Sequence, residues 1–215
     1  MIKAVIFDMD GVMIDSEPIW FKVDNALIKK FGAPKDIDYR AKILGVTAKV
    51  AIKTLRSLFD LKGATSKIIK TRFKIVKKLF RERVKLNSGA LQLFKNLNQE
   101  GYALAVASSA PIDIINIILT KFKIKKYFKV VVAGHNLKRS KPHPDIFLKA
   151  AKKLMIIPDN CLVIEDALSG ELAAKRAGMK CIIVRHKYNQ DIKFKLANKV
   201  VKSLKEINLK IIENL

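Results

Sequence analysis

Two aspartates separated by one residue, Asp8 and Asp10, end a short apolar segment and precede Gly11. A carboxylate can attack the phosphorus of a phosphate ester and form an aspartyl-phosphate. A second carboxylate can protonate the leaving oxygen and then activate water, which is worth roughly 10²- to 10⁴-fold in rate. Alone, the pair is equally consistent with an Asx turn at a strand end. It does not fit an EF-hand loop, because Gly11 comes too early and residues 12–14 are apolar.

Other groups suited to phosphate chemistry also follow apolar runs. Ser108 and Ser109 come directly after one run, and Lys141 lies after the next. A serine hydroxyl and free amides can hold phosphoryl oxygens, and a lysine neutralises the charge that builds on a transferring phosphoryl group. Taken singly, the serines are also typical of a helix cap, and Lys141 is one lysine among many.

Two further acidic residues, Glu165 and Asp166, follow a later apolar run. They could simply cap a helix. Carboxylates gathered at one place repel each other and need a cation, however, and a small set of hard oxygen ligands suits Mg²⁺. The order of all these groups, each after its own apolar run, therefore indicates a magnesium-dependent phosphoryl-transfer site.

Short apolar strands alternating with helices must position these groups. Such alternation predicts βαβ units and a parallel sheet covered on both faces, with ligands bound outside the carboxyl ends of the strands. We therefore expect an α/β, Rossmann-like core. The predicted strands are 2–7, 103–107, 130–133, 162–164, 181–184 and 199–201.

The segment between Asp15 and Val84 shows helical periodicity and no convincing strand. A helix is predicted from Pro18 to a stop at Gly32, followed by helices over 48–60 and 66–82. We therefore expect a helical cap domain over residues 15–85, inserted into an α/β core domain of residues 1–14 and 86–215.

The net charge of +24 suggests an anionic partner, yet the lysines are scattered over nearly every segment. Without a basic stripe, a zinc-ligand spacing or an RNA-binding aromatic motif, compositional bias with solvated helix faces is the better explanation, and no nucleic-acid partner is expected. Because no apolar stretch approaches the roughly 18 residues of a membrane span, no membrane partner is expected either. Cys161 and Cys181 lie in apolar runs, which is typical of buried thiols in a cytoplasmic protein. A monomer is the default expectation.

Five segments of the chain resemble the haloacid dehalogenase superfamily, specifically its β-phosphoglucomutase-like phosphatase branch. The resemblance covers nearly the whole chain, with a serine where glycine is usual at position 140 and an alanine where serine is usual at position 167. The resembling segments are Phe-Asp-Met-Asp-Gly-Val at 7–12, Asp-Ser-Glu-Pro at 15–18, Val-Ala-Ser-Ser at 106–109, Ser-Lys-Pro-His-Pro-Asp-Ile-Phe at 140–147 and Val-Ile-Glu-Asp-Ala-Leu-Ser-Gly at 163–170.

The resemblance implies a role for each residue of the predicted site. Asp8 would be the nucleophile and a Mg²⁺ ligand, and Asp10 the general acid and base, with its backbone carbonyl on the metal. Asp166 would bind Mg²⁺, with Glu165 bound to the metal directly or through a neighbour. Lys141 would orient Asp8 and the phosphate, Ser108 and the Ser109 amide would hold the phosphoryl group, and the cap would be mobile.

Two cap positions depart from the sugar-phosphate mutases of this branch. Trp20 stands where those enzymes carry a histidine, and it either faces the substrate or packs in the cap. The cap loop at 44–47 matches, and the resemblance implies that Lys49, two residues later, contacts the substrate or its phosphate. Lys49 replaces an arginine, however, and lysine lacks the bidentate fork of a guanidinium. We therefore expect a phosphatase acting on a small phosphomonoester, such as a sugar phosphate or nucleotide, rather than a mutase.

Two alternatives remain open beside the phosphatase. The first is a β-phosphoglucomutase-type enzyme that returns the phosphoryl group to a sugar. The second, motivated by the charge alone, is a basic nucleic-acid-binding protein on a retained fold. Dehalogenation is disfavoured, because dehalogenases of this superfamily lack the aspartate at the position of Asp10.

Overall fold

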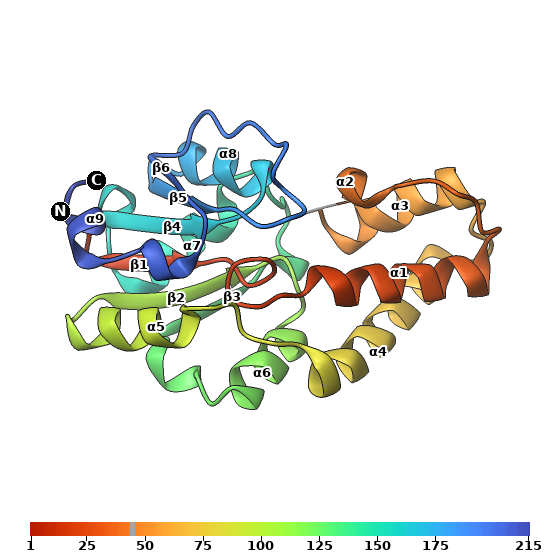
Figure 1. The fold of residues 1–215 in the computed structure, drawn as a ribbon, viewed down its shortest axis with the longest axis horizontal. Coiled ribbons are helices and arrows are strands. Elements are labelled where there is room, and N and C mark those ends of the chain that lie inside the picture. The colour runs from red at the N-terminus through yellow and green to blue at the C-terminus, as the bar shows by residue number, and fades with distance from the viewer. Residues whose placement is uncertain (44–45) are drawn as a thin grey trace.

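The computed structural model describes residues 1–43 and 46–215. Its six strands form one all-parallel sheet in the order β3-β2-β1-β4-β5-β6, which confirms the α/β fold predicted from the sequence (Figure 1). The strands are β1 (Ala4–Phe7), β2 (Ala103–Ser108), β3 (Val130–Ala133), β4 (Cys161–Glu165), β5 (Lys180–Val184) and β6 (Lys199–Val201). The helices are α1 (Glu17–Phe31), α2 (Arg40–Ile43), α3 (Ala48–Phe59), α4 (Thr65–Arg83), α5 (Ala90–Gln99), α6 (Ile112–Lys121), α7 (Asp145–Leu154), α8 (Leu168–Arg176) and α9 (Leu209–Glu213).

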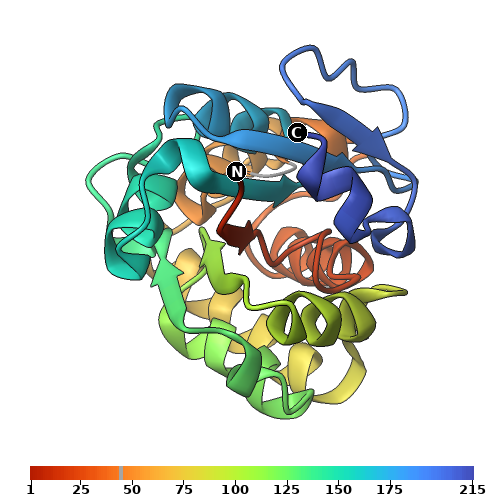
Figure 2. The same cartoon turned by 90° about the vertical axis from the view of Figure 1, so that its left-hand side faces the viewer.

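Helices cover both faces of the sheet, so successive strand residues enter two different cores. In β1, Val5 and Phe7 belong to the core shared with α5, α6 and α9, whereas Ala4 and Ile6 belong to the core shared with α7 and α8. Figure 2, which looks from the end that carries both termini, shows helices on both sides of the sheet. Burial on both faces explains why the strands read as nearly continuous apolar runs.

Aromatic packing fixes the end of β1, where the first two aspartates emerge. Phe7 is fully buried, and its ring meets those of Phe94 and Phe128 edge-on at centroid distances of 5.0 and 6.0 Å. Edge-to-face pairs of this kind add about 0.5–1.5 kcal/mol beyond the area that they bury. The backbone that leads into Asp8 is therefore held by the core.

Helices α1 to α4 lie beyond the carboxyl ends of the strands, and we call them the helical lobe (Figure 1). Leu27, Ile52, Leu55 and Phe59 give this lobe a core of its own. The two chain connections to the lobe run side by side: the Asp15 amide donates to the Lys85 carbonyl and the Asn87 amide to the Met13 carbonyl, each at 3.0 Å. The short helix α2 was not predicted, because four residues are too few to show a helical period.

A buried ion pair joins the two long helices of the lobe. Arg72 of α4 donates from Nε and Nη2 to the two carboxylate oxygens of Asp24 of α1, at 2.7 and 3.0 Å. The side chains are only 8 % and 1 % exposed, so each charge depends on the other for its stabilisation. In the described part of the chain, no helix is long and apolar enough to cross a membrane.

Replacing Asp24 with asparagine is expected to lower the free energy of unfolding by about 3–5 kcal/mol, because the Arg72 charge is left buried without a partner. Urea unfolding followed by circular dichroism measures this loss. The double variant Asp24→Leu, Arg72→Met should lose much less. The control Lys35→Ala, which removes the exposed pair of Lys35 with Asp60, should leave stability nearly unchanged, because solvent screens this pair. Equal losses in Asp24→Asn and Lys35→Ala would contradict the assignment.

Candidate functional site

A cavity lies between the carboxyl ends of the strands and the helical lobe. Asp8 follows β1, Ser108 ends β2 and Glu165 ends β4, and all three line this cavity. The parallel sheet brings them together, because all its strands end at the same edge. Of the predicted site residues, the cavity wall contains Asp8, Asp10, Trp20, Ser108, Ser109, Lys141, Glu165 and Asp166.

Lys141 lies between two buried carboxylates. Its ammonium nitrogen is 2.5 Å from Asp8 Oδ1 and 2.5 Å from Glu165 Oε1, and its side chain is 4 % exposed. Burial alone would lower the pKa of Lys141, but the carboxylates of Asp8 and Glu165 outweigh it and hold the pKa above its ordinary value. The lysine is therefore charged at all physiological pH values.

Both carboxylate oxygens of Glu165 are already engaged. Oε1 accepts from Lys141, while Oε2 accepts from the backbone amides of Asp166 and Ala167 at 2.8 and 2.9 Å. The carboxylate also packs on Gly170, where an added Cβ would lie 1.9 Å from Glu165 Cδ. Glu165 thus fixes Lys141 and the backbone that carries Asp166.

The remaining carboxylates crowd one another at low exposure. Burial raises the pKa of Asp8 to about 7, with Lys141 opposing the shift and the Glu165 charge adding to it. Burial also raises the pKa of Asp166 well above its usual range, and the charges of Glu165 and Asp8 raise it further. A divalent cation among these oxygens would lower both pKa values by favouring the charged forms.

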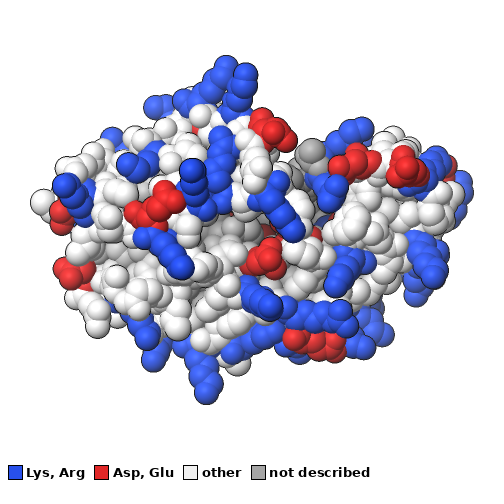
Figure 3. Space-filling view, viewed as in Figure 1, with Lys and Arg blue, Asp and Glu red and all other residues white. Residues whose placement is uncertain are grey.

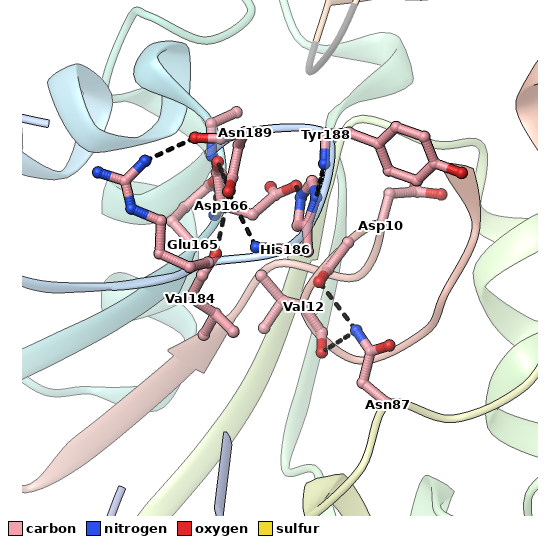
Figure 4. Close-up of polar contacts among 12 residues, drawn as sticks. Asp10, Val12, Asn87, Glu165, Asp166, Val184, His186, Tyr188 and Asn189 are labelled. Carbon is pink, nitrogen blue, oxygen red and sulfur yellow. Dashed lines mark hydrogen bonds and ion pairs between the residues drawn. The ribbon is translucent and has the colours of Figure 1, made fainter. Parts of the chain in front are cut away.

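Asp166 has a histidine partner that comes from the next strand end. His186, two residues after β5, lies with Nε2 at 2.8 Å from Asp166 Oδ2 (Figure 4). Its Nδ1 accepts a hydrogen bond from the Tyr188 amide at 3.2 Å. Because Nδ1 is an acceptor, the neutral ring carries its proton on Nε2 and donates it to Asp166. Burial also lowers the pKa of His186, which favours this neutral form.

The loop after β5 is built around Asn189 and Arg185. The side-chain nitrogen of Asn189 donates to the backbone carbonyls of Asp166 and Val184, and its side-chain oxygen accepts from the backbone amide of His186 (Figure 4). Arg185 Nη1 donates to the carbonyls of Asn189, Gln190 and Ile192 at 2.6–2.9 Å. His186 is therefore held in position by the loop itself.

The turn after Asp10 is closed by a residue of the core segment that follows the helical insert. Asn87 donates from its side-chain nitrogen to the carbonyls of Gly11 and Val12, both at 2.8 Å (Figure 4). Gly11 has a positive φ of 74°, and a Cβ there would lie 2.0 Å from Asp166 Oδ2. Only glycine gives the Asp166 carboxylate room against this turn.

Asp10 is half-buried and faces the helical lobe. Its Oδ1 accepts a hydrogen bond of 2.8 Å from the indole nitrogen of Trp20 in α1. Burial raises the pKa of Asp10, and the Trp20 hydrogen bond opposes that shift. Trp20 packs on Phe80 within the lobe, contacts this carboxylate and also lines the cavity, so the structure is compatible with both roles considered for it.

The serines lie where β2 gives way to α6. Ser108 is buried, and its hydroxyl oxygen accepts from the Ala110 amide at 3.1 Å. Ser109 is partly exposed in the cavity wall. The N-terminus of α6 follows at Ile112, so its backbone dipole is oriented favourably for an anion beside these serines.

Lys49 lies apart from the other predicted residues. It is exposed on α3 and is absent from the cavity wall, although its neighbours Thr47 and Ala48 line it. Arg40 and Tyr39 line the cavity from the segment around α2. The predicted cap-loop match at 44–47 falls partly on positions 44 and 45, which lie outside the described residues.

His186, Asn189, Asn87 and Arg72 were missed by the sequence reasoning. His186 follows the predicted strand at 181–184, so the strand-end position that indicates Asp8, Ser108 and Asp166 is a signal for His186 as well. The side chains of Asn189 and Asn87 donate hydrogen bonds to backbone carbonyls, and Arg72 pairs with Asp24 inside the lobe. No sequence spacing predicts those contacts.

Among the described residues, no three or more acidic, histidine or cysteine side chains gather closely enough to form a ready-made metal cage. Mg²⁺ does not require one, since it retains several waters and shares phosphate oxygens, using one or two protein carboxylates. Asp8 and Asp166, beside the turn at Gly11, are donors of the right chemical type. The residues present therefore fit Mg²⁺.

Comparison with known proteins gives consistent matches over most of the chain. Residues 5–184 match the family model described as haloacid dehalogenase-like hydrolase. The phosphorylated carbohydrates phosphatase of Thermotoga maritima is 33 % identical over 180 residues, which are 84 % of this chain and 83 % of that protein. Hexitol phosphatase B of Escherichia coli O157:H7 is 30 % identical over 214 residues, 97 % of this chain and 96 % of that protein.

Two solved structures are closely similar in fold. CbbY from Rhodobacter sphaeroides, in complex with phosphate, superposes with a TM-score of 0.90 at 25 % identity, covering 99 % of this chain and all of that one. The β-phosphoglucomutase of Clostridium difficile gives a TM-score of 0.86 at 25 % identity, covering all of this chain and 96 % of that one.

Replacing Lys141 with methionine is expected to destabilise the protein by about 3–5 kcal/mol at pH 8, because two buried carboxylates lose their cation. The folded-state pKa of Asp8 already lies above its unfolded value and rises further without Lys141. Protonation at pH 5 therefore relieves the repulsion, and the loss should be clearly smaller there. Urea unfolding at the two pH values measures the difference. Lys149→Met, on the exposed side of α7, is the matched control, and an equal loss of Lys141→Met at both pH values would count against this electrostatic assignment.

Proposed function

The chain belongs to the haloacid dehalogenase-like hydrolases, and its matching relatives in that family include phosphatases. We propose that it is a Mg²⁺-dependent phosphatase of small phosphomonoesters. The observation that carries the proposal is the buried Asp8, paired with Lys141 and facing a cavity that also contains Asp10 and Ser108. A carboxylate held beside a fixed cation, at the end of a parallel strand, is suited to attack phosphorus.

The reaction proposed has two steps through a covalent intermediate. Asp8 attacks the phosphorus, the bond from phosphorus to the ester oxygen breaks, and Asp10 gives its proton to that oxygen. An aspartyl-phosphate and a free alcohol result. Asp10 then takes a proton from water, the water oxygen attacks phosphorus, and inorganic phosphate leaves as Asp8 is regenerated.

Lys141, Ser108 and Ser109 would bind the phosphoryl group. The Lys141 ammonium favours the ionised form of Asp8 and so opposes the effect of its burial, and it lies where negative charge builds in the transition state. Ser108 and the backbone around Ser109, at the start of α6, supply hydrogen bonds to phosphoryl oxygens. Their contribution is to orient the phosphorus toward Asp8.

Asp8, Asp166 and the backbone carbonyl of Asp10 would hold Mg²⁺. When bound, the ion neutralises the phosphate charge and the crowded carboxylates. Glu165 has both oxygens engaged by Lys141 and by two backbone amides. We therefore assign Glu165 a positioning role instead of direct metal binding. His186 orients Asp166 in the manner of the hydrogen-bonded partners that tune metal ligands elsewhere.

The helical lobe would act as a mobile cap over residues 15–85, on a core of residues 1–14 and 86–215. Two adjacent chain connections join the lobe to the core, and the cavity lies between the lobe and the core. Closure of the cap would exclude bulk water from the phosphoryl group and would select the substrate.

Sugar phosphates are the substrate class that we propose. The matching relatives are named as phosphatases of phosphorylated carbohydrates and hexitols. The lobe contributes Tyr39, Arg40 and Thr47 to the cavity wall. Their side chains already bond to Asn25, Asp38 and the Val50 amide, and we propose that their further hydrogen-bonding capacity serves substrate hydroxyls. A nucleic-acid partner is not proposed, because lysine and arginine side chains on the face shown in Figure 3 are spread over the core and the lobe instead of forming one stripe.

Asp8→Asn is expected to reduce hydrolysis of 4-nitrophenyl phosphate to background, because an amide cannot attack phosphorus. EDTA should do the same to the wild type, with recovery on addition of Mg²⁺. Release of 4-nitrophenol measures both. Asp159→Asn, exposed at the opposite end of β4, is the matched control and should retain full activity. Wild-type rates in Asp8→Asn would refute the nucleophile.

A panel of phosphorylated metabolites tests the substrate class and the mutase alternative together. Hexose and hexitol monophosphates should release inorganic phosphate fastest, with nucleoside monophosphates slower. Incubation with β-glucose 1-phosphate should yield glucose and phosphate, since Trp20 and Lys49 replace the residues typical of mutases. Formation of glucose 6-phosphate, detected by coupled oxidation, would instead establish a mutase.

A further inference from the structure

The contact between Trp20 and Asp10 crosses from the helical lobe to the core. Trp20 belongs to α1, and its indole N–H donates to Asp10 Oδ1 at 2.8 Å. That N–H is the only polar group of the side chain. The hydrogen bond therefore fixes which of the two carboxylate oxygens faces the lobe.

The indole contacts two residues of α4. The ring of Phe80 meets it edge-on at a centroid distance of 5.7 Å, and the Arg72 guanidinium carbon lies 4.2 Å from the ring centroid. Arg72 is itself held by its bidentate pair with Asp24 of α1. The direction of the N–H is thus set by the packing of α1 on α4, and it follows the lobe as a unit.

We propose that Trp20 is a positioning residue for the general acid and base: it occupies Oδ1 of Asp10, leaves Oδ2 to exchange the proton, and couples this carboxyl to the position of the helical lobe. The inference rests on the proposed phosphatase function. It goes further by giving Trp20 a part in proton transfer instead of substrate contact.

A chemical consequence separates this role from simple packing. An alkoxide is a poor leaving group and needs the proton from Asp10, whereas 4-nitrophenolate leaves readily without one. In the first step, a misplaced Asp10 therefore slows alkyl phosphates selectively. Hydrolysis of the aspartyl-phosphate also uses Asp10, but it is common to both substrates and affects kcat without entering kcat/KM. Damage to the fold or to the cap would slow both kinds of substrate together.

The variant Trp20→Phe retains an aromatic ring against Phe80 and Arg72 but removes the N–H. We expect kcat/KM for the hexose phosphate that the wild type hydrolyses fastest to fall by about 10- to 100-fold, within the range of acid–base catalysis. The value of kcat/KM for 4-nitrophenyl phosphate should fall by less than about threefold, because its leaving group needs no proton and the indole is not assigned a substrate contact.

Leu58→Ala, at a partly buried residue that packs against the core of the helical lobe and lies outside the cavity wall, is the matched control. It weakens the lobe without touching Asp10, so the ratio of the two kcat/KM values should remain that of the wild type. An equal fall of kcat/KM for both substrates in Trp20→Phe would overturn the proposal. Failure of the wild type to hydrolyse any phosphate ester would instead overturn the proposed function.

A second measurement does not depend on activity. The chain has one tryptophan, so a ¹H–¹⁵N correlation spectrum shows one indole resonance. Asp10→Ala should move this resonance upfield by removing the carboxylate acceptor, whereas Asp36→Ala, an exposed aspartate elsewhere in the insert, should leave it in place. An indole resonance unmoved by Asp10→Ala would show that the hydrogen bond is absent in solution and would overturn the proposal.

Discussion

The site depends on one buried cation placed among carboxylates that repel one another. Lys141 contacts Asp8 and Glu165 at 2.5 Å each, and Asp166 lies in the same cluster. Without compensation, gathering these charges away from water would cost several kcal/mol for each ion. The protein reduces that cost with Lys141, with backbone amides on Glu165 and with a neutral histidine on Asp166. The charge that remains uncompensated would favour a divalent ion, in line with the Mg²⁺ proposed for this site.

The same electrostatic demand explains how the surrounding loops are built. The carboxylates can face one another only if their backbones cannot relax apart, and each backbone is fastened by a side chain from elsewhere. Asn87 closes the turn after Asp10, and Asn189 ties the Asp166 carbonyl to the end of β5. The glycines at positions 11 and 170 leave space for carboxylates where a Cβ would collide. Rigid loops on a rigid sheet thus hold charges in an arrangement that flexible loops would avoid.

The helical lobe takes part in the electrostatics as well as covering the cavity. Its buried pair of Asp24 and Arg72 orients Trp20, and Trp20 contacts Asp10. A closed ion pair is a costly way to stabilise a small helical unit, since apolar residues of similar volume are often at least as stabilising. Because the Arg72 guanidinium lies over the Trp20 ring, we infer that the pair serves to orient the indole more than to stabilise the lobe.

The sequence by itself determined the sheet, its alternation with helices and the set of groups at four strand ends, because apolar runs and strand-end positions are local patterns. It determined neither His186 as the partner of Asp166 nor the contact from Trp20 to Asp10, and it favoured Lys49 where the structure places Arg40 and Tyr39 in the cavity wall. Those contacts join residues brought together by packing of helices and loops. Their distances depend on the whole chain, whereas the order of motifs depends on each segment alone. Only the tertiary structure could therefore decide how Asp8, Asp10 and Asp166 are held.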